Sequence, residues 1–278
     1  MRKLINIELF KIFSKPRTYI GFGAIIIIVL AIEFGIYFEG NTIVEMIMQN
    51  IRDRFIFEGN VINVFLVSYV VLNTLWIHVP ILVALVTGDL LAGEANSGTF
   101  RLILTRPVSR VRLVLAKFVA GWIYAVLLVV VMALLSIGLG LILFGSGDLL
   151  VVTNKVNIFS ADDVMWRFIC AYGYGILSMT TVAALSFLLS ALSDNSIGPI
   201  IGTIALIIGI TIISTVGVSL LGNANQYLFT SYLPSWQLFF QTGTNPAGLS
   251  HAILIQSVYI VGFLGATIWC FQKKDILS

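Results

Sequence analysis

Six long apolar stretches dominate the chain, and shorter polar intervals separate them. The stretches are residues 19–38, 61–87, 114–144, 165–192, 197–221 and 251–271. A helix needs about 20 apolar residues to cross the hydrocarbon core of a bilayer, so each stretch is long enough to span it. The pattern predicts an all-α polytopic membrane protein, with six transmembrane helices in one domain over residues 1–278.

Three of the remaining segments carry patterns of their own. Residues 1–14 mix apolar and basic side chains, which is typical of a helix lying in the membrane interface, and Pro16 ends that helix. Residues 39–60 have apolar side chains at helical spacing, which predicts a short amphipathic helix on the outer surface. Residues 222–250 are rich in aromatic side chains and carry no charge, so we expect short re-entrant segments at the outer interface there.

Composition and charge support the same class of protein. Hydrophobic residues make up 59% of the chain and charged residues only 10%, whereas soluble domains have about 25% charged residues. Lys and Arg are concentrated in residues 1–17, 101–117 and 273–274. Because cytoplasmic loops carry an excess of positive charge, this distribution predicts that both termini are cytoplasmic, in a bacterial inner membrane.

The polar interval between the second and third stretches has the pattern of a short helix between two breaks. Asn96, Ser97 and Gly98 break the preceding helix, and Pro107 stops the next one after residues 99–105. Ser109 suits the N-cap of the third span. Apolar side chains that a short helix shows to the cytosol require a partner surface, which favours a docking element over a solvated basic connector. The apolar residues of this helix are Phe100, Leu102 and Ile103.

The same interval contains an ordered motif, E-x3-G-T-x5-T-R-P-V-S-R-x6-K, which begins at Glu94 and ends at Lys117. This motif resembles that of the permease subunits of ABC-type exporters of the type-2 permease family. In that family the motif also lies between the second and third spans. The layout of nearly the whole chain resembles the family, and this interval is the part that matches at motif level.

The resemblance implies a coupling helix that docks on a separate ATPase subunit, with Glu94, Gly98 and Thr99 at the contact. From the chemistry of their side chains we add further contact residues, namely Phe100, Arg101, Leu102, Ile103 and Arg106. The family arrangement implies two permease chains, identical or related, and two ATPase subunits that bind ATP and Mg²⁺. This chain would then be a transport subunit, not an enzyme, with no cofactor of its own and no nucleic-acid partner.

Nucleotide and metal sites are not expected in this chain. Gly93 and Gly98 have the spacing of a phosphate-binding loop, but Thr99 stands where the lysine should follow. The two histidines are far apart in the sequence, and Cys170 and Cys270 are isolated in apolar stretches, so neither a metal site nor a disulfide is indicated.

Four residues inside the spans are candidates for the transport pathway. Glu33 is the one acid well inside a span, and such an acid is a functional candidate. It also lies near the outer end of its span, where its side chain would simply reach water. We prefer this second interpretation. His78 precedes Pro80 closely and would bond a carbonyl that the proline frees. Tyr172 and Tyr174 would line a path or pack between helices.

Two other classes of protein are alternatives to a transporter. A membrane-embedded enzyme is disfavoured because the chain has neither an H-E-x-x-H nor a G-x-S-x-G motif. A membrane scaffold that binds a cytosolic partner without transport remains open. The apolar spans fit a lipid-like, peptide or hydrophobic drug cargo better than a sugar or an ion.

Overall fold

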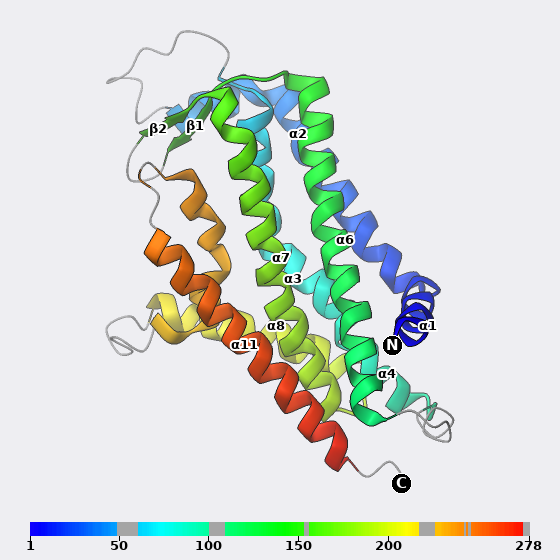
Figure 1. The fold of residues 1–278 in the computed structure, drawn as a ribbon. Coiled ribbons are helices and arrows are strands. Elements are labelled where there is room, and N and C mark those ends of the chain that lie inside the picture. Colours follow the sequence, from blue (N-terminus) through cyan, green and yellow to red (C-terminus); the bar gives the residue numbers. More distant parts are fainter. Residues whose placement is uncertain are drawn as a thin grey trace.

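A computed structural model describes residues 1–48, 61–99, 109–152, 156–216, 226–241, 243 and 246–274. The chain folds as a bundle of helices (Figure 1), six of which are long and apolar enough to cross a membrane. These segments are Pro16–Gly40, Ile77–Asn96, Arg110–Phe144, Ala161–Leu192, Ile197–Val216 and Pro246–Lys273. The prediction of a polytopic α-helical membrane protein is therefore confirmed at this level.

The chain begins with the short helix α1 (Arg2–Phe13), followed by the long helix α2 (Pro16–Met48). Pro16 is the first residue of α2, a position where its missing N–H removes no helical hydrogen bond. The prediction of a separate amphipathic helix over residues 39–60 is wrong for residues 39–48, because α2 continues to Met48. Extending a formed helix costs far less than starting a new one, and no proline interrupts it. Residues 49–60 lie outside the described part of the chain.

Helices α3 (Val64–Thr87) and α7 (Ala161–Leu192) lie at the centre of the bundle. The spanning windows that include α7 and the second half of α3 are each 67% buried, against 17–28% for the other four. Helix α7 packs against α3, α6 (Arg110–Phe144), α8 (Ile197–Val216) and α11 (Pro246–Lys273). Both central helices are therefore covered by the outer ones, whose exposed faces carry many apolar side chains.

The connection between α6 and α7 is a hairpin, where the sequence led us to expect only a polar loop. Strands β1 (Leu149–Val152) and β2 (Val156–Phe159) pair antiparallel, with Leu149 opposite Phe159. Valine and isoleucine favour β-strands. Each strand has only four residues, and charged residues lie close to both, so the sequence of this interval does not stand out as a pair of strands. Asn63, which caps α3, donates to the Asp148 carbonyl at 2.7 Å and so holds the hairpin to the bundle.

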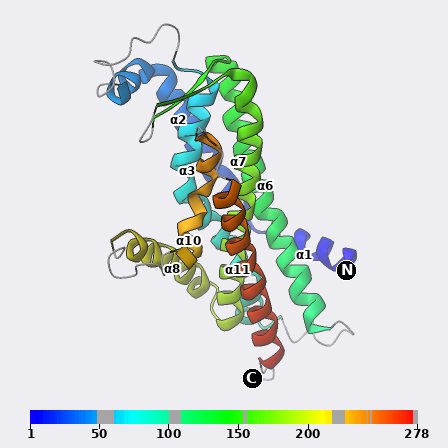
Figure 2. The same ribbon diagram turned by 60° about the vertical axis from the view of Figure 1, so that its left-hand side comes forward.

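Two short helices precede α11, within the stretch where the sequence predicts re-entrant segments at the outer interface. They are α10 (Phe229–Tyr232), which packs against α8 and α11, and η2 (Leu233–Phe240), which runs beside α7 (Figure 2). The Tyr174 hydroxyl donates to the Tyr232 carbonyl and the Arg167 guanidinium to the Phe239 carbonyl, both at 2.7 Å. Side chains of α7 thus satisfy backbone groups that such short helices leave open.

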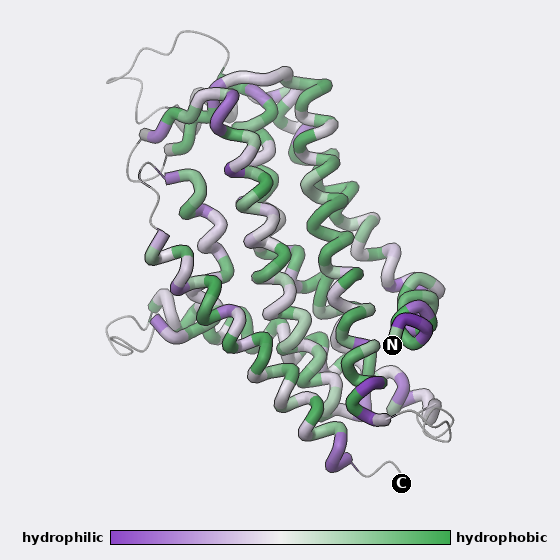
Figure 3. Tube along the Cα trace, in the orientation of Figure 1, coloured by the Kyte–Doolittle hydropathy of each residue, from purple (hydrophilic) through white to green (hydrophobic). Residues whose placement is uncertain are grey.

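Hydrophilic residues gather at the ends of the bundle, and the middle is apolar (Figure 3). Helix α1 and the last turns of α11 lie toward the same end of the bundle, near α4 (Asp89–Asn96) and the start of α6 (Figure 1). There Arg110 donates to the carbonyls of Gln272 and Lys274, each at 3.0 Å, which ties the start of α6 to the end of α11. We call this the terminal end of the bundle.

Helix α4 is capped by a residue of α7. The buried Ser190 hydroxyl accepts hydrogen bonds from the backbone N–H groups of Leu91 and Ala92, at 3.0 and 2.9 Å. Leu91 lies in the first turn of α4, where a backbone N–H has no acceptor within the helix itself. The contact joins the central loop to the core of the bundle.

Ser190→Ala is expected to destabilise the protein by about 1–3 kcal/mol, because two buried donors lose their acceptor. The melting temperature of the detergent-solubilised protein measures the effect. Ser257→Ala is the matched control, since the exposed Ser257 hydroxyl bonds only within its own helix. Equal melting temperatures for the two variants would contradict the capping role.

Candidate functional site at the base of the central loop

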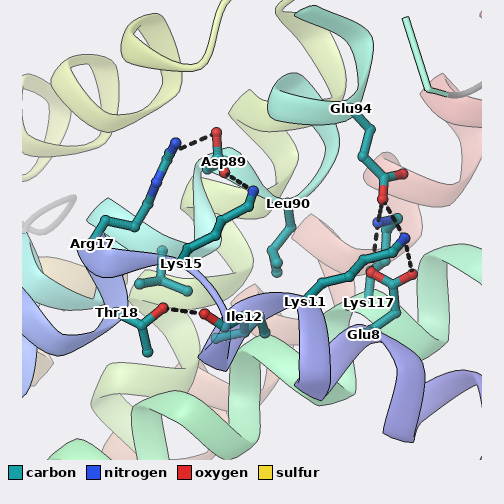
Figure 4. A pocket seen from close by; sticks show the side chains of 11 residues that line it. Glu8, Lys11, Ile12, Lys15, Arg17, Thr18, Asp89, Leu90, Glu94 and Lys117 are labelled. Atoms are coloured by element: carbon teal, nitrogen blue, oxygen red, sulfur yellow. Dashed lines mark hydrogen bonds and ion pairs between the residues drawn. The ribbon is translucent and has the colours of Figure 1, made fainter. Parts of the chain in front are cut away.

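Four charged side chains from three helices meet at the terminal end of the bundle (Figure 4). Lys117 of α6 lies 2.7 Å from Glu8 of α1 and 2.6 Å from Glu94 of α4. Lys11 of α1 contacts the same two carboxylates at 2.8 and 2.7 Å. We call Glu8, Lys11, Glu94 and Lys117 the ion network; its two acids and two bases balance in charge.

Burial makes this network different from an ordinary surface ion pair. The Lys117 side chain is 1% exposed, and those of Glu8 and Glu94 are 4% and 13% exposed. On α1, Glu8 and Ile12 form the buried face, one helical turn apart, and this face packs on α6. Losing one partner would leave a buried charge uncompensated, so the members of the network depend on one another.

A second set of ion pairs lies beside the network. Asp89, at the first position of α4, is 2.7 Å from both Lys15 and Arg17. A carboxylate at that position also interacts favourably with the helix dipole. Leu90 and Ile12 lie between the two sets (Figure 4). Together the two sets fasten both ends of α4 to the first residues of the chain.

The space enclosed by these side chains is too small to hold a ligand. Its volume is about 20 Å³, which is close to the room that one water molecule needs. The ion network can therefore hold helices together, and protonation of its side chains can weaken that contact, but it is not a substrate pocket. Its place at both ends of the loop, on α4 and α6, is what makes it a candidate functional site.

The charges of the network shift the pKa values of its α1 members in opposite directions. Burial raises the pKa of Glu8, but the charge of Lys117 and hydrogen bonds from both lysines outweigh burial and bring it below its ordinary value of 4.5. Burial lowers the pKa of Lys11, but hydrogen bonds to Glu8 and Glu94 outweigh it and bring the pKa above its ordinary value of 10.5.

These directions predict a stability that falls at both extremes of pH. Glu8 contributes fully above pH 4.5, and its contribution is lost as pH falls through the lowered pKa. Lys11 contributes fully below pH 10.5, and its contribution is lost as pH rises through the raised pKa. Melting temperatures measured across this range should fall less steeply on the acid side for Glu8→Gln than for the wild type. An unchanged acid-side slope would contradict the assignment.

The structure describes only the first part of the expected coupling segment. Gly98 has a φ of +68°, a conformation that glycine adopts at little cost, so the break expected there is confirmed. The backbone N–H of Thr99 donates to the Glu94 carbonyl at 3.1 Å and closes the end of α4. Five residues of the predicted contact lie outside the described residues: Phe100, Arg101, Leu102, Ile103 and Arg106. Ser109 caps α6 as predicted, because its hydroxyl accepts from the Arg112 N–H.

Glu94 points into the ion network and not outward. Its carboxylate is engaged by Lys11 and Lys117, and its side chain is 13% exposed. In this conformation Glu94 holds α4 against α1 and α6, so its part in any docking surface is to position the loop.

The candidate pathway residues lie in different surroundings. The expectation that Glu33 reaches water is wrong: the residue is fully buried, because it belongs to the inward face of α2. His78 is exposed and its Nδ1 lies 3.0 Å from the carbonyl of Thr74, so it bonds backbone, though not the carbonyl that Pro80 frees. Tyr172 and Tyr174 are buried and pack between helices, each in a hydrogen bond at 2.7 Å.

The sequence identified only half of the ion network. It singled out Glu94 and Lys117 by motif, but not their partners on α1. One signal was available, because Glu8 lies one turn from Ile12 on the apolar face of an amphipathic helix. An acid on such a face is rarely buried unless it is paired, so its position predicts a basic partner.

Comparison with known proteins gives a family without a described activity. A family model described as "Protein of unknown function (DUF2705)" matches residues 26–277. "Uncharacterized protein YhcI" of Bacillus subtilis (strain 168) is 24% identical over 205 residues, which cover 70% of this chain and 63% of that protein. The chain thus spans less than two thirds of this relative. The family match includes Glu94 and Lys117, whereas Glu8 and Lys11 precede it.

Proposed function

Because the chain belongs to the family described as protein of unknown function (DUF2705), we propose its function from its own residues. It is the membrane-spanning permease subunit of an ATP-driven transporter, with both termini in the cytoplasm of a bacterium, and it works as an exporter. The observation that carries the proposal is the ion network, which joins the two ends of the central loop through the 2.6 Å contact between Glu94 and Lys117.

A coupling helix must be attached rigidly to the membrane-spanning helices if movement of a partner protein is to move those helices. Glu94 lies just before the loop and Lys117 just after it, and Glu8 links both to α1. Breaking a buried ion pair costs about 3–5 kcal/mol, so α1, α4 and α6 move together. Helix α4 follows α3 directly, and the hydroxyl of Ser190 on α7 caps it. A force on the loop therefore reaches the two central helices.

The proposed partners follow from this arrangement. The segment from Thr99 to Arg106 docks on an ABC-type ATPase subunit, which supplies the ATP and Mg²⁺ chemistry. Glu94 and Gly98 position that segment. Two permease chains, identical or related, assemble with two ATPase subunits, since one chain offers one coupling segment. The apolar helices favour a hydrophobic cargo.

The test is to express the full chain together with each ATP-binding-cassette ATPase encoded in its source genome in turn, and to purify any complex that forms. Native mass spectrometry should show two permease and two ATPase chains, and the complex should hydrolyse ATP. Stimulation of that hydrolysis by a hydrophobic compound would separate a transporter from a membrane scaffold. Failure of the two proteins to associate, or a one-to-one complex with full activity, would contradict the proposal.

A further inference from the structure

An acid occupies an apolar position on the buried face of α2. Ile25, Val29, Glu33 and Ile36 follow each other at helical spacing and face the bundle; the first three are each 0% exposed. This face packs against α3 and α6. Glu33 is thus buried in the place where its neighbours on the same face are aliphatic.

The carboxyl group of Glu33 has no hydrogen-bond partner among the described residues, and this holds for both oxygens. The charged residues of the helices around it lie near helix ends. On α6 these are Arg110, Arg112 and Lys117, and on α7 they are Asp162, Asp163 and Arg167. Helix α3 contributes only the exposed His78. No described cation is therefore placed to neutralise a charge on Glu33.

A chain of buried hydroxyl groups begins with a tyrosine that interacts electrostatically with Glu33. Tyr172 of α7 lies within electrostatic range of Glu33 and shares a 2.7 Å hydrogen bond with Ser136 of α6. Ser68 of α3 donates to the Ser136 carbonyl at 2.9 Å. The three residues are buried, and their hydrogen bonds join α3, α6 and α7.

Burying an isolated carboxylate in such surroundings costs far more free energy than burying the neutral acid. The Glu33 carboxyl group therefore binds a proton instead of carrying a charge. We propose that Glu33 is a proton-binding site inside the membrane-spanning part of the bundle. The proton stays on Glu33 while α2 packs against α3 and α6. Loss of the proton requires water to reach the group, and therefore requires α2 to separate from the bundle. The inference does not depend on the transport function.

Carbodiimides test this directly, because they react with protonated acids. The acid proton moves to one reagent nitrogen, a carboxyl oxygen bonds to the central carbon, and the acyl group then migrates to nitrogen. No group leaves, so the peptide gains the mass of one reagent molecule. The full chain in detergent at neutral pH is treated with the hydrophobic dicyclohexylcarbodiimide or with a water-soluble carbodiimide, and labelled peptides are identified by mass spectrometry.

The hydrophobic reagent should label Glu33, and the water-soluble reagent should not. Glu39, exposed on the same helix, is the internal control that the water-soluble reagent reaches. Glu33→Gln should lose the hydrophobic label, whereas Glu39→Gln should keep it. Glu33→Gln should also keep the wild-type melting temperature, because a neutral amide replaces a neutral acid. Labelling of Glu33 by the water-soluble reagent, no labelling by either reagent, or a large fall in the melting temperature of Glu33→Gln would overturn the proposal.

Discussion

Lys117→Met should destabilise the protein more than any other single change in the ion network. Methionine fills much of the volume of lysine but removes the charge, so the buried Glu8 and Glu94 carboxylates lose the base between them. Removing one partner of a buried pair costs about 3–5 kcal/mol. Lys11 remains, but it is 38% exposed and cannot replace a fully buried base.

For a chain of this size the loss corresponds to a fall in melting temperature on the order of 10 °C. Lys15→Met is the matched control, since Lys15 is 45% exposed and Asp89 keeps its contact with Arg17. An exposed pair contributes about 1 kcal/mol or less, so the control should melt close to the wild type. Adding Glu94→Gln to Lys117→Met should restore part of the loss, because Lys11 then has to neutralise only one of the two buried carboxylates. Similar melting temperatures for Lys117→Met and Lys15→Met would contradict the cooperative network.

The spanning helices could be predicted from the sequence because membrane burial leaves a local signal. A run of about 20 apolar residues is visible without knowing any partner. The ends of two helices differ from those expected: α7 begins at Ala161 and not at residue 165, and α2 continues to Met48. Polar residues at a helix end do not show where the hydrogen bonds stop, because the first and last turns lie in contact with water or with loops.

The ion network could not be predicted in the same way, because its contacts are not local. Lys117 is 109 residues from Glu8, and Lys11 is 83 residues from Glu94. Hydropathy places each charge at a helix end but does not say which charges meet there. Glu33 shows the same limit. Its position near the end of an apolar run suggested contact with water, and only the packing of α2 shows that it is enclosed.

Phe100→Ala is expected to weaken ATPase association about thirtyfold. Truncating a buried aromatic anchor at an interface commonly costs about 2 kcal/mol or more, and 1.4 kcal/mol corresponds to about a factor of ten. Phe100 follows the break at Gly98 and precedes Leu102 and Ile103, so it is placed to be such an anchor. The ion network does not include Phe100, so the melting temperature of the isolated chain should be unchanged.

Recovery of the ATPase with affinity-purified permease, together with ATP hydrolysis by the complex, tests the central claim most directly. Phe38→Ala is the matched control, because Phe38 is 76% exposed on α2, far along the chain from the central loop. The proposal predicts that Phe100→Ala loses most of the bound ATPase and its activity while Phe38→Ala keeps both. Undiminished recovery and hydrolysis with Phe100→Ala would show that the central loop is a solvated connector and would contradict the transport function proposed for this chain.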